Sequence, residues 1–145
     1  MLKGFADVIK TTNSFVILLN GKFPRVDPNI HKMLTKLEAV FGKEMWNHVI
    51  LGVSFWSYKD SAIMERTRSG KTEEWLKEAL NTELQEKFNI GREVDAVFID
   101  SWAKQPFNLN DTTQQKAFDR ETKKLWNIFH KMKDFEFKGT SNACI

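Results

Sequence analysis

Three short apolar stretches recur along the chain, separated by longer amphipathic stretches. The first, residues 14–19, is a nearly unbroken apolar run that is followed by the turn signal Asn20-Gly21. A run of this length is too short for a core helix and is typical of a strand buried on both faces. Residues 48–55 and 94–99 repeat the pattern. The sequence therefore predicts an α/β fold with about three mainly parallel strands.

The stretch after the first strand predicts a helix with clear ends. Asp27 followed by Pro28 is typical of a helix start, because the carboxylate caps free N–H groups and proline fits the first helical position. An apolar stripe at helical spacing then continues until Gly42, a residue typical of a helix end. Residues 2–11 predict a shorter amphipathic helix before the first strand.

The second half of the chain predicts two further helices. Thr72 and the two glutamates after it predict a start, Gly91 predicts the end, and the buried stripe would include Trp75. We expect only a helical turn or a loop at residues 61–71. A last helix is expected at residues 112–132, burying Phe118, Leu125, Phe129 and Met132.

The length of 145 residues predicts one domain with its own core, and residues 134–145 would be a flexible tail. No apolar run reaches the roughly 18 residues of a membrane helix, and the N-terminus lacks an apolar signal-peptide region. The single cysteine, Cys144, excludes an internal disulfide framework and favours a reducing compartment. We therefore expect a cytoplasmic protein without a transmembrane segment.

Positive charge is concentrated near the end of the chain. Residues 1–112 carry 15 basic and 15 acidic side chains, whereas residues 113–138 carry seven basic and four acidic ones. The net charge of +3 therefore comes from the last helical stretch. Two interpretations are open: a solvated helix face, or a surface for phosphate groups or an acidic partner. No nucleic acid partner is predicted.

Chemistry is expected at the carboxyl ends of the strands, where doubly wound sheets bind ligands. The loops at residues 20–26, 55–61 and 100–105 meet at that edge. Trp102 could stack on a planar base, and the carboxylate of Asp60 could accept two hydrogen bonds from a guanine edge. Trp56 and Tyr58 fit either a ligand role or packing within the loop.

These stretches together resemble the C-terminal half of an immunity-associated, GIMAP-type GTPase domain, from a family related to septins and chloroplast import GTPases. The resemblance covers roughly residues 1–132 and is spread over several segments, namely residues 12–21, 40–46, 55–60 and 97–102. It implies a partial, three-layer P-loop-GTPase-like fold with four to five helices. Residues 1–133 would then be one truncated GTPase-like domain.

The resemblance also implies a site for the nucleotide base. The family reads guanine with a Thr-(Arg/His)-Lys-x-Asp pattern, which residues 57–61 match in part. If Lys59 takes the lysine position, Ser61 falls at the acidic position; a shift by one residue restores Asp60 but puts Tyr58 in place of the lysine. The loop after the third strand would cover the other face of the base. The candidate base-binding residues are Ser57, Tyr58, Lys59, Asp60, Ser61, Ser101 and Trp102.

The sequence has no G-x-x-x-x-G-K-[ST] motif and no Asp-x-x-Gly, and its seven glycines are isolated. Without these motifs there is no cradle for the phosphates and no Mg²⁺ site. We therefore expect no catalytic or metal-binding residues and no cofactor for this chain alone. GTP or GDP would bind only if the missing N-terminal half were supplied. The histidines are scattered and expected at the surface, at His31, His48 and His130.

Three functions fit this pattern. The first is a GTPase-family domain that no longer hydrolyses GTP and acts as a protein-interaction or regulatory module. The second is the C-terminal fragment of an active GTPase. The third is a half-domain that assembles with itself, as a dimer. The strand at residues 13–20 would lie at an open sheet edge, is apolar at Ile17, Leu18 and Leu19, and contains no Pro or Lys to prevent pairing. In the alternative arrangement, the helix at residues 2–11 covers this edge.

Overall fold

The computed structural model describes residues 11–132 and 135–136, and its centre is a parallel three-stranded sheet in the order β2-β3-β4. The strands are β2 (Phe15–Asn20), β3 (Val49–Ser54) and β4 (Asp95–Phe98). Phe15 pairs with Val49 and Ile50 pairs with Asp95, so each strand runs in the same direction as its neighbour. The predicted α/β fold with three parallel strands is confirmed.

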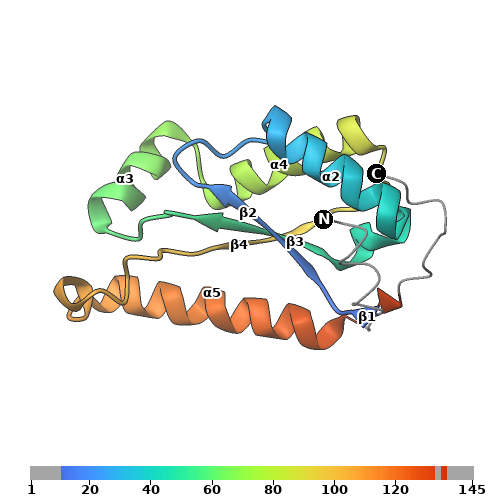
Figure 1. Ribbon diagram of the computed structural model, residues 1–145. Helices are drawn as coiled ribbons and strands as arrows, with labels where there is room; N and C mark the ends of the chain where they lie inside the picture. Colours follow the sequence, from blue (N-terminus) through green and yellow to red (C-terminus); the bar gives the residue numbers. More distant parts are fainter. Residues whose placement is uncertain (1–10, 133–134, 137–145) are drawn as a thin grey trace.

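Helices lie on both faces of this sheet (Figure 1). α2 (Pro28–Phe41) and α4 (Glu73–Phe88) lie on one face, and α5 (Thr112–Lys131) lies on the other. α3 (Asp60–Ser69) follows β3 at the carboxyl end of the sheet. Two 3₁₀ turns, η1 (Lys43–His48) and η2 (Pro106–Asn108), connect these elements.

The helix starts follow the capping residues in the sequence. Asp27 accepts a hydrogen bond from the Ile30 N–H, and Thr72 accepts one from the Trp75 N–H, so each cap satisfies a free donor of the first turn. The predicted end at Gly91 is wrong. α4 stops two residues earlier because Asn89 adopts the left-handed conformation, with φ 51° and ψ 48°.

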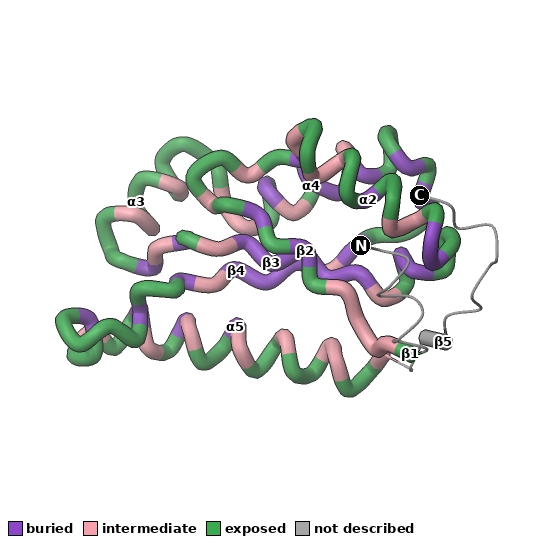
Figure 2. Tube along the Cα trace, in the orientation of Figure 1, coloured by how far each residue is buried: buried purple, intermediate pink, exposed green. Residues whose placement is uncertain are grey.

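The main core lies between the sheet and the layer of α2 and α4. Inward-facing strand residues such as Ile17, Leu19 and Leu51 pack with Leu34 of α2 and Leu80 of α4, and all five are at most 5% exposed. Figure 2 shows this burial along β3 and β4. The core is therefore built on one face of β2 and on the whole of β3.

The prediction that the first strand is buried on both faces is wrong. Val16 is 38% exposed and Leu18 is 69% exposed, although Ile17 and Leu19 are buried. The reason is that α5 packs along β4, at the far side of the sheet from β2. One face of β2 is therefore apolar and accessible.

Other expectations about burial and helices are also wrong. The α5 residues expected to be buried, Phe118, Leu125, Phe129 and Met132, are only half-buried, and Gln114, Ala117 and Glu121 are buried instead. Trp75 was expected in the core of α4 but is 48% exposed. The segment at residues 61–71, expected as a helical turn or a loop, forms most of the ten-residue helix α3. No buried side chain anchors α3, which explains its weak sequence signal.

A second, two-stranded sheet joins the ends of the described chain. β1 (Thr11–Thr12) pairs antiparallel with β5 (Phe135–Glu136), which belongs to the segment expected as a flexible tail. The predicted helix at residues 2–11 and the rest of the predicted tail lie outside the described residues, apart from Thr11. Within the described part of the chain, no helix has the length and apolar character needed to cross a membrane.

Candidate functional site

A pocket of about 270 Å³ lies at the carboxyl ends of the three parallel strands. Its walls come from the loops after β2, β3 and β4 and from the first turn of α5, and comprise Lys22, Phe55, Ser57, Lys59, Asp100, Trp102, Phe107, Asn108 and Gln114. The three loops meet because parallel strands end at the same edge of the sheet. The pocket is hence where the strand pattern predicts a ligand.

The predicted base-binding residues divide into two groups. Ser57, Lys59 and Trp102 line the pocket. The side chains of Tyr58, Asp60, Ser61 and Ser101 are not part of its lining: Tyr58 is buried, and the other three are exposed. Asp60 is the first residue of α3, so the chain has already left the pocket there.

The carboxylate that does line the pocket belongs to Asp100, which sequence reasoning did not select. Asp100 is 3% exposed, and its Oδ1 accepts a hydrogen bond of 3.0 Å from the Trp102 N–H. This bond shapes the turn that presents the Trp102 ring. The signal in the sequence was the position of Asp100 directly after the third apolar run.

Gln114 is the second pocket residue that sequence reasoning missed. It is 1% exposed, and its Nε2 donates a 2.8 Å hydrogen bond to Asp111 Oδ2. Its Oε1 is buried and has no hydrogen-bond partner in the described structure. An unsatisfied buried acceptor costs about 1–3 kcal/mol, so an N–H group of a ligand would be stabilised there. The position of Gln114 in the sequence did not indicate that it would line a pocket.

Aromatic rings form the outer walls of the pocket. Trp102 and Phe107 are 53% and 68% exposed, and their ring centroids are 6.0 Å apart. Phe55 has a φ of 55°, which is rare for an aromatic residue and costs about 1–3 kcal/mol, and its ring faces the Lys22 Nζ at 5.8 Å. Exposed rings beside buried acceptors suit a planar ligand that carries N–H donors.

Tyr58 and Trp56 are buried and do not line the pocket. The Tyr58 hydroxyl donates to Glu73 Oε1 at 2.6 Å, and the Trp56 Nε1–H donates to the same oxygen at 3.2 Å. The Arg66 guanidinium lies 4.4 Å from the Trp56 ring centroid. Burial, followed by the hydrogen bond to Glu73, raises the pKa of Tyr58 well above its usual value. These contacts fix the loop after β3 to α4.

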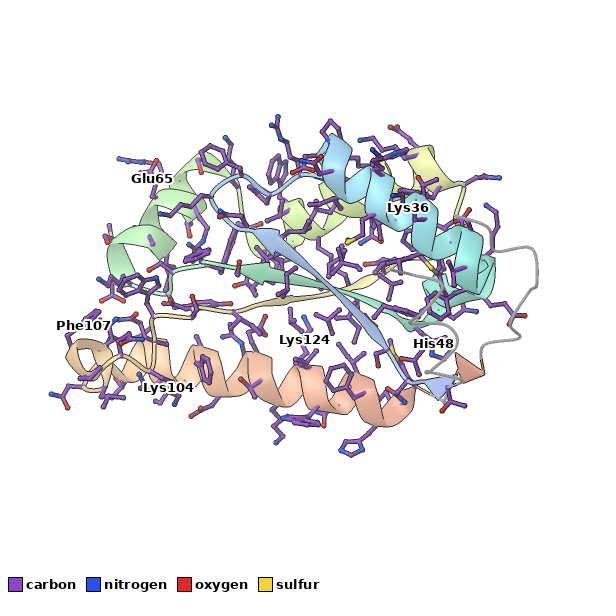
Figure 3. All side chains as sticks on the ribbon, in the orientation of Figure 1. Lys36, His48, Glu65, Lys104, Phe107 and Lys124 are labelled. Atoms are coloured by element: carbon purple, nitrogen blue, oxygen red, sulfur yellow. The ribbon has the colours of Figure 1, made fainter. Side chains whose placement is uncertain are left out.

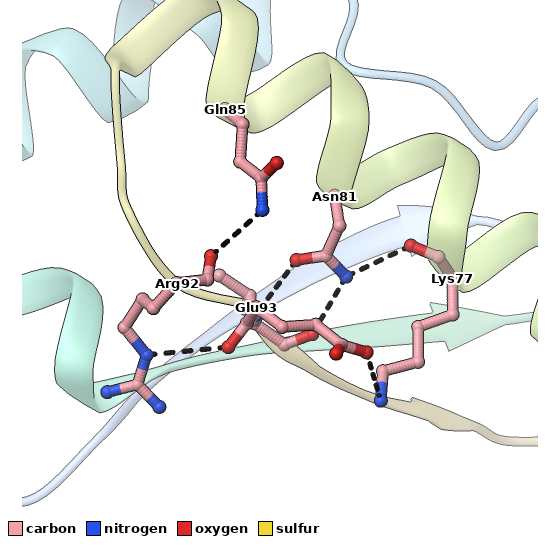
Figure 4. Close-up of polar contacts among 6 residues, drawn as sticks. Lys77, Asn81, Gln85, Arg92 and Glu93 are labelled. Atoms are coloured by element: carbon pink, nitrogen blue, oxygen red, sulfur yellow. Dashed lines mark hydrogen bonds and ion pairs between the residues drawn. The ribbon is translucent and has the colours of Figure 1, made fainter.

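Side chains bond to the outer edge of β4 near both of its ends. Asn81 of α4, whose contacts are drawn in Figure 4, bonds to both backbone groups of Val94. Glu121 Oε1 accepts a 3.1 Å hydrogen bond from the Phe98 N–H. The Tyr58 hydroxyl also lies 3.2 Å from the Phe98 carbonyl oxygen. The backbone groups of successive strand residues point to opposite sides of the strand. Since the Ile99 N–H bonds to β3, the backbone groups of Val94 and Phe98 point away from β3. A further strand therefore cannot bind at these two positions without displacing side chains.

The outer edge of β2 has no such protection in the described part of the chain. The Gly21 N–H donates to the Ser54 carbonyl of β3 at 2.7 Å, so alternation turns the backbone groups of Val16 and Leu18 away from β3. Among the described residues, no group bonds to these outward N–H and C=O groups. Unpaired groups on an apolar strand are a template for another strand.

The fold and these two features define an α/β domain with a parallel sheet, one open sheet edge and a loop pocket at the carboxyl ends of its strands. No protein-family model matches the chain, and no curated protein matches it significantly. Within residues 11–132 and 135–136, no three His, Cys, Asp or Glu side chains gather as a metal ion would require.

Proposed function

We propose that this chain is a protein-interaction module that accepts a strand of a partner along the outer edge of β2. The contrast between the two sheet edges carries the proposal. Side chains occupy the outward groups of Val94 and Phe98 in β4, whereas no described residue occupies those of Val16 and Leu18 in β2. Strand addition at an open edge is a common mode of protein recognition, with main-chain hydrogen bonds supplying affinity.

A second copy of the chain is the simplest partner. Two β2 strands pairing about a two-fold axis would join two three-stranded sheets into one sheet of six strands. The apolar side chain of Leu18, which is 69% exposed, would then lie near the seam and lose part of its contact with water. A heterologous partner strand would use the same backbone groups.

The module would be a GTPase-like domain, as the resemblance to the GIMAP-type family implies. By itself it would not hydrolyse GTP. Phosphoryl transfer depends on a phosphate cradle and a metal site, and the sequence has neither motif. The chain alone would bind GTP weakly or not at all. Calorimetric titration with GTP and Mg²⁺ tests this, and sub-micromolar affinity or protein-dependent phosphate release would contradict it. If the chain is the C-terminal fragment of an active GTPase, adding the N-terminal half would restore hydrolysis.

The strand-pairing proposal is tested with Leu18→Lys, which places a charge at the β2 seam. Leu18 is exposed, so the variant should fold, whereas Ile17→Lys would bury a charge because Ile17 is 5% exposed. Met64→Lys on α3 is the control, since Met64 is 72% exposed and far from β2 in sequence. Light scattering across a concentration series should show a dimer for the parent and the control.

Leu18→Lys should weaken that dimer about tenfold or more, because an unpaired charge at a seam opposes association. Hydrogen exchange should show the Val16 and Leu18 amides protected only at concentrations where the dimer forms. A monomeric mass at high concentration, together with these amides protected at every concentration, would overturn the proposal for self-pairing.

A second candidate function is recognition of a nucleoside base in the pocket at the carboxyl ends of the strands. The unsatisfied Oε1 of Gln114 favours it, because a ring N–H would supply the missing donor beside the exposed Trp102 ring. Titration with guanosine should shift amide NMR signals in residues 55–59 and 100–108, and Trp102→Ala should abolish the shifts. Shifts confined to residues 20–26 would contradict this candidate.

A further inference from the structure

A second concave surface lies at the opposite end of the sheet from the loop pocket. It is a groove of about 780 Å³ between the start of β4 and the C-terminal half of α5. It shares no lining residue with the loop pocket. Its charged lining is five cations and one acid, namely Arg92, Arg120, Lys123, Lys124, Lys131 and Asp95. Most of the positive charge that the sequence concentrates near its end therefore faces one groove.

The helical spacing explains why these side chains share a face. Arg120, Lys124 and Lys131 are separated by four and seven residues, which places them in one stripe along α5. Eleven residues of helix span about 16 Å, so the stripe follows the length of the groove. In Figure 3, Lys124 lies between α5 and the sheet. Ile128 and Met132 add an apolar part to the lining.

Of the five cations that line the groove, Arg120 forms an ion pair with a described carboxylate, that of Glu121, and the other four form none. In the described structure, no carboxylate forms an ion pair with Lys123, Lys124 or Lys131. Some lysines elsewhere do have such a partner: Lys77 lies 2.8 Å from Glu93, and Lys104 lies 3.2 Å from Asp119. Cations held together without counter-charges repel one another, so a bound anion would relieve this repulsion.

The other two cations of the groove, Arg92 and Arg120, are positioned by contacts with neighbouring residues. The Arg92 Nη1 donates a 2.8 Å hydrogen bond to Asn47 Oδ1, which fixes its guanidinium on the wall opposite α5. The Arg120 Nε lies 3.6 Å from Glu121, and its guanidinium lies 5.3 Å from the Tyr58 ring centroid. Positioned guanidinium groups suit phosphate oxygens, which they contact through two parallel N–H bonds.

We propose that this groove binds a compact anion with two or more phosphate groups. Four of the five cations form no ion pair in the described structure, and they match several negative charges in a small volume. The groove also has the size of a small-molecule site, which is about 300–1,000 Å³. A single carboxylate or phosphate would leave most of the cations unused. The same chemistry is present in a free polyphosphate and in the headgroup of a phosphorylated inositol lipid.

Calorimetric titration with inorganic tripolyphosphate at physiological salt tests the proposal. We expect a dissociation constant of about 10–100 µM, which corresponds to several charge-assisted hydrogen bonds at a site open to water. The double variant Lys124→Gln/Lys131→Gln should weaken binding at least about tenfold, because both side chains line the groove. Both residues are exposed and form no ion pair in the described structure, so the fold should be retained, which circular dichroism checks.

The matched control is Lys32→Gln/Lys36→Gln, which removes the same charge from exposed positions on α2, on the other face of the sheet. It should leave the affinity within about twofold of the parent. An equal loss in both variants would show attraction to net charge alone and overturn the proposal. So would equal affinity for orthophosphate and tripolyphosphate, or no binding of either.

Vesicles distinguish the two sources of the phosphates. Phosphatidylcholine vesicles that contain a bisphosphorylated inositol lipid should sediment the chain if the ligand is a headgroup, and tripolyphosphate should then release it. Vesicles with phosphatidylserine at equal charge should not sediment it. Binding of tripolyphosphate without any vesicle sedimentation assigns the groove to a free ligand, while equal sedimentation by both vesicles would contradict recognition of grouped phosphates.

Discussion

Asn81 and Val94 form a reciprocal pair of hydrogen bonds between α4 and the start of β4. Asn81 Oδ1 accepts from the Val94 N–H at 2.6 Å, and Asn81 Nδ2 donates to the Val94 carbonyl oxygen at 3.0 Å. The side-chain amide thus replaces the backbone of a neighbouring strand. This contact closes one end of the β4 edge, which is why β2 is the edge on which the proposed pairing rests.

Replacing Asn81 by leucine should lower the free energy of unfolding by about 2–4 kcal/mol, because two buried backbone groups lose their partners. Gln85→Ala is the control, since the Gln85 Nε2 makes only a 3.3 Å hydrogen bond to the Arg92 carbonyl at an exposed site. Urea unfolding should show a loss of less than about 1 kcal/mol for the control. Equal stability of the two variants would contradict the role given to Asn81.

Replacement by alanine should destabilise the protein far more at Gly21 than at Gly52. A Cβ at Gly21 would lie 2.4 Å from the Ser54 carbonyl oxygen, a backbone atom that cannot move without breaking the β2–β3 pairing. Gly21→Ala should cost about 2–3 kcal/mol of unfolding free energy. At Gly52 the nearest atom is the exposed Leu18 side chain, at 2.9 Å. Gly52→Ala should therefore cost less than about 1 kcal/mol, and thermal melts of both variants measure the difference.

Because of Tyr58, the free energy of unfolding should fall as the pH rises into the alkaline range. Its folded pKa is raised by burial and by Glu73, so the folded state keeps its proton where the unfolded state loses it, above about pH 10. The stabilisation is complete below the unfolded pKa and is lost as pH rises toward the folded pKa, with a slope of at most about 1.4 kcal/mol per pH unit.

Tyr58 is the only tyrosine among the 145 residues, so tyrosinate absorbance reports it alone. We expect that absorbance to appear together with unfolding, measured by far-ultraviolet circular dichroism, and not before it. Tyr58→Phe should remove the part of the pH dependence that lies above pH 10. Ionisation of Tyr58 at its usual pKa in a protein that is still folded would contradict the buried contact with Glu73.

Asp111 should make the start of α5 sensitive to acid. Its pKa is lowered by hydrogen bonds from the side chain and then the backbone of Gln114, so its stabilising effect is present above the unfolded pKa and is lost as pH falls through the folded pKa. Asp111→Ala should lower the urea midpoint at pH 7 because the cap is lost.

Asp111→Asn is the matched variant, because asparagine caps a helix without carrying a charge. It should keep most of the stability at pH 7 and should lack the loss that the parent shows in acid. A urea midpoint that is the same for the parent and Asp111→Ala at pH 7 would show that the cap contributes nothing.

Much of the fold could be predicted from the sequence because local physics decides it. The apolar runs around Ile17, Ile50 and Val97 predicted three strands, and all three are present in parallel register. Asp27 and Thr72 marked helix starts correctly, since capping depends only on neighbouring residues. The meeting of three loops at the carboxyl ends followed from parallel connectivity alone.

Tertiary structure decided which of these residues are buried and which meet. Val16 and Leu18 read as core residues, yet they are exposed because α5 lies along β4, and helix placement is not encoded in the periodicity of a strand. Asp100, Gln114 and Trp102 come from separate segments, so only folding brings them into one pocket. The sequence indicated an excess of basic residues in the stretch that forms α5. Only the packing of α5 against β4 makes these residues one wall of a groove that has Arg92 on its other wall.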